Sequence, residues 1–252
     1  MKLHHKILGE GEPLIILHGL FSTLDNWQSL AKKYAEHFKV ILVDQRNHGH
    51  SPHSDEMSYE LMVEDLFELM NDLRIEKTNI IGHSMGGKTA MFFAQQYPGL
   101  VEKLVVADMG LKKYPPHHDE IFESMLTMDF NVITTRKKAE EHIRTFFTDN
   151  GVIQFLLKNL YWGDDQKLAW RMNLHVLNKK IENILAGVPQ KKCEVETLFV
   201  RGSKSNYIED ADWKEIKTLF PRSTLSTLNT GHWVHAEDPQ GFYDITKEFL
   251  LS

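Results

Sequence analysis

Residues 80–88 read Ile80-Ile81-Gly82-His83-Ser84-Met85-Gly86-Gly87-Lys88, which places a serine in a G-x-S-x-G pattern. The apolar run before the pattern predicts a short buried strand over residues 79–81. The residues after it, 89–97, are apolar at helical spacing and are followed by Pro98-Gly99, which ends a helix. A serine between a strand and a helix is the context of a nucleophile elbow.

The residue types around Ser84 suit a serine that acts as a nucleophile. A serine hydroxyl is a weak nucleophile and must be held in the open, facing a base. Gly82 and Gly86 lack a Cβ atom, so two chain segments can approach closely around the turn. Ser84 also precedes a helix, where free backbone N–H groups favour negative charge. We therefore expect the N–H of Met85 to be one donor to an oxyanion.

Composition bounds the class of protein. The chain has 252 residues, of which 42% are hydrophobic and 25% charged, enough for one core with a small inserted domain. A net charge of −6 without a basic stripe argues against nucleic acid as a partner. The single cysteine, Cys193, excludes an intramolecular disulfide. We find no signal peptide and no membrane span, so a cytoplasmic location is expected.

Strand and helix patterns alternate along both flanks of the chain. Apolar runs predict strands over residues 3–8, 14–17, 40–43, 79–81, 103–107, 196–200 and 223–228. Helical patterns cover residues 26–37, 59–73, 89–97, 210–220 and 239–250. This alternation predicts an α/β fold with a mostly parallel central sheet and helices on both faces. Ligands of such sheets bind at the carboxyl ends of the strands, where His18, Asp44, Ser84 and Asp108 fall.

The middle of the chain has a different character. Between residues 112 and 190 we find helical patterns over 120–128, 135–147, 152–162 and 174–185 and no convincing strand. We therefore expect residues 111–193 to form an all-helical cap, inserted into a core made of residues 1–110 and 194–252. Its apolar side chains form its own core and favour an apolar substrate site beneath it, with room for a medium or long acyl group.

The serine needs a base, and the chain offers 14 histidines. His232 follows the last predicted strand in a loop where Gly231 allows a turn toward the site, so we prefer it to His235. We interpret His18 and His83 as structural or site-lining residues, and Trp233 as site-lining. The histidine clusters at 4–5, 48–53 and 117–118 lack a matching set of ligands, so no metal is expected. Lys88 is expected to be a surface charge.

Several motifs together resemble the α/β-hydrolase superfamily. They are His18-Gly19, Asp44-x-Arg46-x-x-Gly49-x-Ser51, Gly82-His83-Ser84-Met85-Gly86-Gly87 and Gly231-His232. A closer likeness is to the YbfF-type small acyl esterases and related mitochondrial abhydrolase-domain proteins. It is carried by His18-Gly19-Leu20-Phe21-x-x-x-Asp25-Asn26-Trp27, Asp44-x-Arg46-Asn47-His48-Gly49-x-Ser51-Pro52, Ala107-Asp108-Met109 and Trp170-Arg171-x-Asn173-Leu174. The resemblance implies hydrolysis of carboxylic esters or acyl thioesters without a cofactor.

The chain departs from the family at the triad acid. In most members the acid lies three residues after the glycine of the Arg201-Gly202 type of turn, and that position here is Ser205. Some members are similar in placing the acid at the end of the preceding strand, where this chain has Asp108. We expect Asp108 to be the acid and Ser205 an additional hydrogen-bond partner, with Asp210 as the alternative. Asp44 is expected to brace the loop that follows it.

The sequence therefore predicts a serine hydrolase in which Ser84 attacks, His232 acts as base and Asp108 orients the imidazole. The second oxyanion donor is the N–H of Leu20, or of Phe21. The expected partner is a small-molecule ester or thioester, such as an acyl-CoA, and the expected assembly is a monomer or a small homo-oligomer. The same framework also supports hydrolysis of C–C or peptide bonds and acyl transfer, and a non-catalytic ligand-binding homologue is a further alternative.

Overall fold

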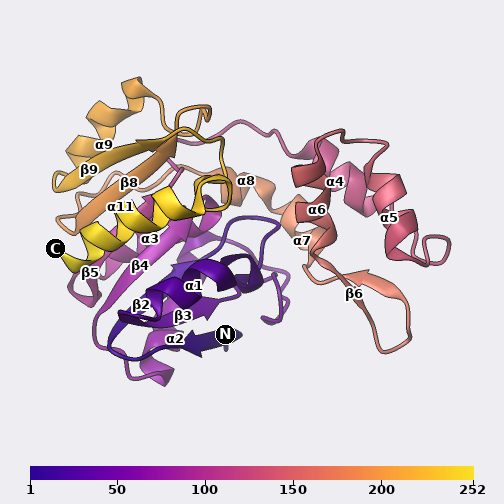
Figure 1. Ribbon diagram of the computed structural model, residues 1–252, viewed down its shortest axis with the longest axis horizontal. Helices are drawn as coiled ribbons and strands as arrows, with labels where there is room; N and C mark the ends of the chain where they lie inside the picture. Colours follow the sequence, from indigo (N-terminus) through magenta and orange to yellow (C-terminus); the bar gives the residue numbers. More distant parts are fainter.

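A seven-stranded sheet forms the centre of the core in the computed structural model, which describes all 252 residues (Figure 1). Its strand order is β1-β3-β2-β4-β5-β8-β9. All neighbouring strands are parallel except β1, which runs antiparallel to β3 at one edge. The predicted α/β fold with a mostly parallel sheet is therefore confirmed. The strands are β1 (His5–Leu8), β2 (Glu12–Leu17), β3 (Phe38–Val43), β4 (Thr78–His83), β5 (Val101–Ala107), β8 (Glu196–Gly202) and β9 (Ser223–Leu228).

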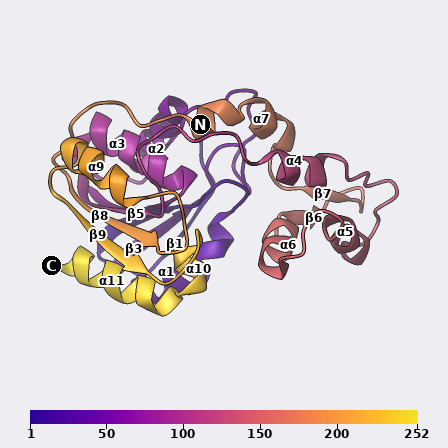
Figure 2. The same cartoon turned by 90° about the horizontal axis from the view of Figure 1, so that it is seen from above.

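Helices cover both faces of the sheet, as Figure 2 shows. One face carries α1 (Gln28–Tyr34) and α11 (Pro239–Leu251), and the other carries α2 (Tyr59–Asp72), α3 (Met85–Gln96) and α9 (Trp213–Leu219). Successive side chains of a strand alternate between these faces: Ile16 of β2 packs with the first group and Leu17 with the second. Because both faces are covered, the middle of each central strand carries apolar side chains on both faces.

Short turns of helix complete the core. The helix predicted over 26–37 is instead a 3₁₀ turn, η1 (Leu24–Trp27), followed by α1, which already ends at Tyr34. The other short elements are η2 (Pro98–Leu100), η3 (Asp210–Asp212) and α10 (Val234–Glu237).

No helix of the chain combines the length and the apolar character needed to cross a bilayer.

The cap lies to one side of the core and contains five helices (Figure 1). They are α4 (Asp119–Leu126), α5 (Arg136–Ile143), α6 (Asn150–Leu157), α7 (Leu174–Lys179) and α8 (Ile181–Leu185). The chain leaves the core after β5 and rejoins it at β8. We propose that residues 111–193 form the cap domain and that residues 1–110 and 194–252 form the core.

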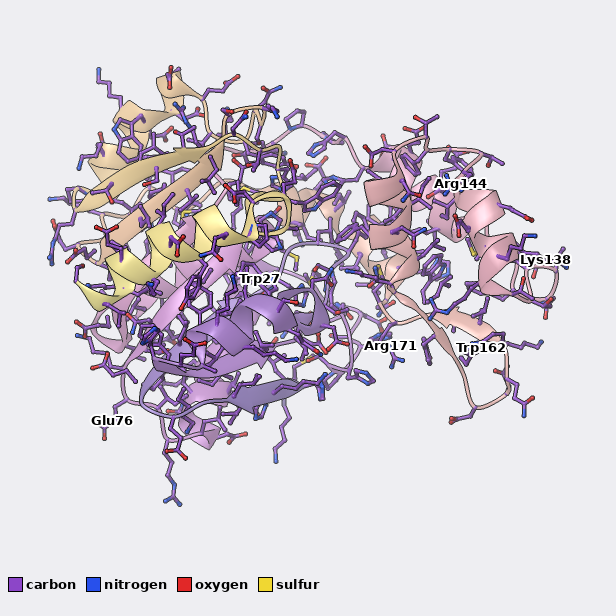
Figure 3. The ribbon with its side chains drawn as sticks, viewed as in Figure 1. Trp27, Glu76, Lys138, Arg144, Trp162 and Arg171 are labelled. Atoms are coloured by element: carbon purple, nitrogen blue, oxygen red, sulfur yellow. The ribbon has the colours of Figure 1, made fainter.

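The cap is not all-helical, which corrects the expectation from the sequence. The helix predicted to reach residue 162 ends at Leu157, and an antiparallel hairpin follows, made of β6 (Leu160–Trp162) and β7 (Leu168–Trp170). Aromatic residues in both strands suit a pleated surface better than a helix, and Gly163-Asp164-Asp165 opens the turn. The hairpin reaches away from the core, with Trp162 near its end (Figure 3).

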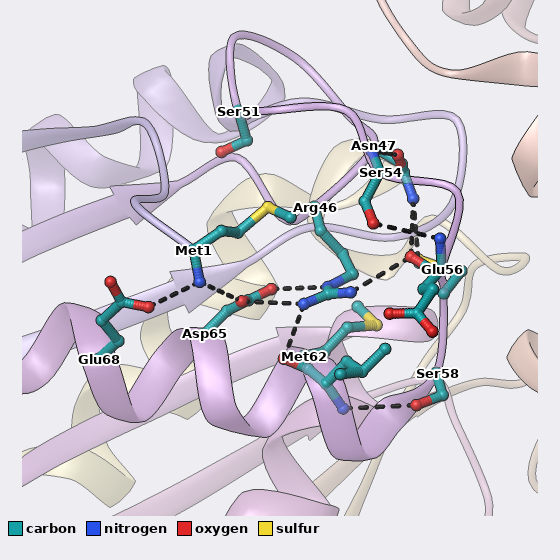
Figure 4. Close-up of polar contacts among 12 residues, drawn as sticks. Met1, Arg46, Asn47, Ser51, Ser54, Glu56, Ser58, Met62, Asp65 and Glu68 are labelled. Atoms are coloured by element: carbon teal, nitrogen blue, oxygen red, sulfur yellow. Dashed lines mark hydrogen bonds and ion pairs between the residues drawn. The ribbon is translucent and has the colours of Figure 1, made fainter.

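A buried ion pair fixes the loop that follows β3. Arg46 Nε lies 2.7 Å from Asp65 Oδ2, and both side chains are buried (Figure 4). The same carboxylate lies 2.6 Å from the N-terminal amino group of Met1. Asp44 accepts hydrogen bonds from the backbone N–H groups of Leu24 (2.8 Å) and His50 (2.9 Å), so it braces the loop as expected.

The cap is seated on this loop through asparagine contacts. The backbone N–H of Asn173 donates to the carbonyl of Asn47 at 2.9 Å, and its side chain reaches Asn47 Oδ1 at 3.2 Å. Farther along, the Asn183 side chain donates to the carbonyl of Met57 at 2.8 Å. Two of the motifs that carry the family resemblance, one in the core and one in the cap, are therefore in direct contact.

Lys88 is buried rather than exposed, which also corrects the sequence interpretation. Its ammonium group donates to the backbone carbonyls of Lys112 (3.0 Å) and Leu185 (3.3 Å) and to that of Ala186. Lys112 lies on the segment that leads into the cap, and the other two lie on the segment that leads out. Lys88 therefore joins both connections between core and cap.

Candidate active site

Ser84 occupies a strained turn between β4 and α3, with φ +52° and ψ −118°. A positive φ at a non-glycine residue costs about 1–3 kcal/mol and persists only where the surroundings enforce it. The two glycines make the turn possible: a Cβ on Gly82 would lie 2.3 Å from the Gly86 carbonyl oxygen, and one on Gly86 would lie 2.3 Å from that of Leu17. The strand, turn and helix of the predicted elbow are therefore present.

His232 and Asp108 meet beside this turn. Asp108 directly follows β5, has φ +46° and has no exposed surface. Its Oδ2 lies 2.8 Å from His232 Nδ1, while its Oδ1 accepts a hydrogen bond from the N–H of Gly202 at 2.9 Å. The hydroxyl of Ser205 donates to the same Oδ2. Ser205 thus contacts the carboxylate rather than the imidazole.

Two aromatic side chains hold His232 in place. The ring of Tyr207 stacks on the imidazole, with centroids 3.9 Å apart and planes 18° apart. His83 Nε2 donates to the backbone carbonyl of His232 at 2.9 Å. Burial lowers the pKa of His83 well below its ordinary value, so the ring is neutral and its single proton lies on Nε2. Sequence reasoning missed Tyr207, because nothing in the pattern around Ser205 indicates a stacking partner.

Two backbone N–H groups without a partner belong to residues near Ser84, one in the loop after β2 and one at the start of α3. The N–H of Leu20 makes no hydrogen bond within the chain, and the N–H of Met85 is the first of α3. His18 lies beneath the loop: its Nδ1 donates to the Gly19 carbonyl at 2.8 Å, and its Nε2 accepts from the N–H of Gln45 at 3.0 Å. Burial lowers the pKa of His18 to about 4, which keeps Nε2 an acceptor. His18 is a structural residue and does not line the cavity.

Phe21 connects this loop to the cap. Its backbone has φ +58°, and its carbonyl accepts a hydrogen bond of 2.8 Å from the side chain of Asn159. Asn159 is buried in the chain segment between α6 and β6. Nothing in the sequence singled out Asn159, because a lone asparagine in a helical pattern carries no signal of a partner 138 residues away.

A cavity of about 550 Å³ lies between core and cap above Ser84. His232 also lines it, although no hydrogen bond joins the Ser84 hydroxyl to the imidazole in this structure. In structures without substrate, catalytic hydrogen bonds are often longer than in the reacting complex. The predicted lining residues Phe21, His83 and Trp233 border the cavity, as does the predicted oxyanion donor Leu20, whereas Ser205 does not. The cap adds side chains that include His117, His118, Ile121, Gln154, Phe155 and Lys158.

The competing residues take other positions. His235 is buried against Trp27, with the rings stacked 4.1 Å apart, and burial lowers its pKa to about 3. It makes no contact with Asp108. Asp210 is exposed and pairs with Arg201 at 2.7 Å. The structure therefore brings together Ser84, His232 and Asp108, whereas His235 borders the cavity without a hydrogen bond to Asp108.

Comparison with known proteins identifies the family of this chain. Residues 12–132 match the family described as the alpha/beta hydrolase fold. The sn-1-specific diacylglycerol lipase ABHD11 of Danio rerio is 39% identical over 96% of this chain and 79% of its own length. The chain belongs to the α/β-hydrolase family. Esterase YbfF of Escherichia coli is 33% identical to this α/β-hydrolase over 94% of the chain and 92% of its own length.

A solved structure is also similar to this α/β-hydrolase. It is described as a marine microorganism esterase, is 42% identical and has a TM-score of 0.96, covering 98% of this chain and 99% of that one. These three relatives are described as esterases or as a lipase, and the expected likeness to YbfF-type esterases and abhydrolase-domain proteins is confirmed. The order Ser84, Asp108, His232 is also the order of triad residues in this family.

Proposed function

We propose that this α/β-hydrolase cleaves carboxylic esters and acyl thioesters through an acyl-enzyme on Ser84. The observation that carries the proposal is the contact of 2.8 Å between His232 and the fully buried carboxylate of Asp108, next to a serine in a strained elbow. A protein that only binds ligands needs neither the buried acid nor the strain. The names of the relatives support oxygen esters as substrates, and the thioester part of the proposal rests on the shared chemistry of acyl transfer.

In the first half-reaction, His232 Nε2 takes the proton of Ser84 while Oγ attacks the carbonyl carbon. Asp108 accepts a hydrogen bond from Nδ1–H of His232, so the proton of the neutral ring stays on Nδ1 and Nε2 is free to act as base. The oxygen that becomes negative is held by the N–H groups of Leu20 and Met85. The intermediate then collapses as His232 returns its proton to the leaving oxygen or sulfur, and Ser84 carries the acyl group.

In the second half-reaction, water takes the place of the leaving group. His232 removes a proton from this water, which attacks the acyl carbon and forms a second tetrahedral oxyanion at the same donors. Its collapse releases the carboxylic acid and returns the proton to Ser84. Besides the ester or thioester and the water that is consumed, the cycle uses only side chains and backbone groups of this chain.

Hydrolysis of p-nitrophenyl esters from acetate to palmitate tests the proposal, together with acetyl-CoA and octanoyl-CoA for the thioester class. We expect turnover by the native protein and its loss in Ser84→Ala, while Ser29→Ala, which removes an exposed hydroxyl of α1, keeps full activity. A fluorophosphonate probe should label the native protein and Ser29→Ala only. Absence of both turnover and labelling in folded native protein would overturn the proposal.

A further inference from the structure

Ser84 borders a second cavity besides the large one. This second cavity, which we call the inner cavity, measures about 20 Å³ and is lined mostly by apolar side chains. Ser84, Leu20, His118 and Tyr207 border both cavities. His232 borders only the large cavity, whereas the side chains of Met85 and Met109 border only the inner one. Ser84 therefore stands at the junction of two spaces that differ in volume and in the neighbours they offer.

The position of His232 decides which part of an ester enters which cavity. The tetrahedral carbon on Ser84 carries Oγ, the oxyanion, the leaving oxygen and the acyl chain. The oxyanion points at the N–H groups of Leu20 and Met85. The leaving oxygen must lie within hydrogen-bond reach of His232 Nε2, from which it takes its proton, so the leaving group extends into the large cavity. The direction that remains for the acyl chain leads to the inner cavity.

Hydrogen bonds hold the two tyrosines in the wall of the inner cavity. The Tyr114 hydroxyl donates to the carbonyl of Tyr207 at 2.6 Å and accepts from the N–H of Gly110 at 2.9 Å. The Tyr59 hydroxyl donates to the carbonyl of Ile184 at 2.6 Å. Both tyrosines are buried, as are Met85, Met109, Ile184 and Leu185 around them. A long acyl chain cannot enter without breaking hydrogen bonds or displacing packed side chains.

We propose that the inner cavity is the acyl site and that it restricts the enzyme to short acyl groups carried on bulky leaving groups. A volume of about 20 Å³ holds little more than one water molecule, so with adjustment of the two methionines it accepts acyl groups of about two to four carbon atoms. This inference rests on the proposed function. The cap also lines the inner cavity, through Tyr114, His118, Ile184 and Leu185. The expectation that changes is therefore the length of the acyl group, from medium or long to short.

Two series of esters test the assignment. In the first, p-nitrophenol is the constant leaving group and the acyl group is acetyl, butyryl or octanoyl. In the second, acetate is the constant acyl group and the alcohol is methanol, benzyl alcohol or 2-naphthylmethanol. We expect kcat/KM to fall at least tenfold from acetyl to octanoyl and to rise with the size of the alcohol.

Variants of each cavity separate the two sites. Met109→Ala, or Ile184→Ala should the first fail to fold, enlarges the inner cavity and should raise the octanoyl-to-acetyl ratio of kcat/KM at least tenfold. Phe155→Ala alters the large cavity and should change the dependence on the alcohol, with the acyl ratio constant within about twofold. Met70→Ala removes the same atoms from a buried site in α2 that borders neither cavity, and should change neither ratio.

The possible failures can be told apart. Efficient turnover with octanoyl esters preferred by the native protein would overturn the assignment of the cavities and leave the proposed function intact. The assignment of the cavities would also be overturned if Phe155→Ala, and neither Met109→Ala nor Ile184→Ala, changed the octanoyl-to-acetyl ratio of kcat/KM. No turnover of any ester by folded protein would overturn both proposals together.

Discussion

His232 Nδ1 lies 2.8 Å from Asp108 Oδ2, and Asp108 is fully buried at the end of β5. A buried carboxylate requires compensating partners, and this one has three: the imidazole, the hydroxyl of Ser205 and the N–H of Gly202. The carboxylate thereby fixes both the orientation of the imidazole and the nitrogen that carries its proton. At the position where most members of the family have the acid, this chain has Ser205, whose neutral hydroxyl donates a hydrogen bond to Asp108.

Replacement of Asp108 by asparagine should lower kcat by about 10³–10⁴-fold, by analogy with other triads, because an amide cannot stabilise the imidazolium and can favour the wrong tautomer. The fold should remain, since the side chain keeps its shape. Steady-state kinetics on p-nitrophenyl acetate measures the effect. Asp210→Asn, which changes an exposed aspartate, should leave kcat as it is, and a loss below tenfold in Asp108→Asn would contradict its role as acid.

Removal of the Ser205 hydroxyl should cost far less. Ser205→Ala deletes one hydrogen bond to the carboxylate, a contribution of about 1–2 kcal/mol, so we expect a loss of roughly 5–30-fold in kcat. Because Ser205 acts through Asp108, its effect should nearly vanish in the Asp108→Asn background. A double-mutant cycle measures this coupling. Additive effects of the two substitutions would show that Ser205 acts independently of the acid.

Asn159 should affect catalysis through the oxyanion loop. Its amide holds the carbonyl of Phe21, next to the proposed donor Leu20, so Asn159→Ala should release the loop and lower kcat about 10–100-fold with KM changed less than threefold. The kinetics should be compared with those of Asn131→Ala, an exposed asparagine of the same cap. An effect on KM alone would instead assign Asn159 to substrate binding.

The parts of the site that follow from local sequence were predictable. Gly82, Ser84 and Gly86 define the elbow because the turn is formed by residues that are neighbours in the chain. Asp108 could be found because it ends an apolar strand on the correct edge of the sheet. Tyr207 and Asn159 could not, because their roles depend on contacts with residues distant in the sequence.

The same reason explains the two errors in the fold. The strands of the cap hairpin have three residues each, too few to show a period of two. Lys88 lies on the helix that follows the elbow, and the sequence around it gives no sign that another segment covers its side chain. The backbone that covers it comes from residues up to 98 positions away, and its burial could not be read from its neighbours.

Lys88 should make stability depend on pH. Burial lowers its pKa to about 7, whereas the lysine of the unfolded chain keeps its ordinary value near 10.4. Between these two values the unfolded state binds the extra proton, so the free energy of unfolding rises with pH across this window and falls as pH drops toward 7. In Lys88→Met this contribution is absent. The native protein should therefore gain about 2 kcal/mol relative to Lys88→Met between pH 7 and pH 9.

Urea unfolding of both proteins at pH 6, 7, 8 and 9 measures the Lys88 effect, with Lys138→Met as the control for loss of an exposed positive charge. Lys88→Met also leaves three carbonyls of the cap connections without a donor, so it should be less stable than the native protein at pH 9. Parallel pH profiles for the native protein and Lys88→Met would mean that the three carbonyls keep Lys88 protonated in the folded state. Its link between core and cap would then be a permanent ion–dipole contact rather than a titrating one.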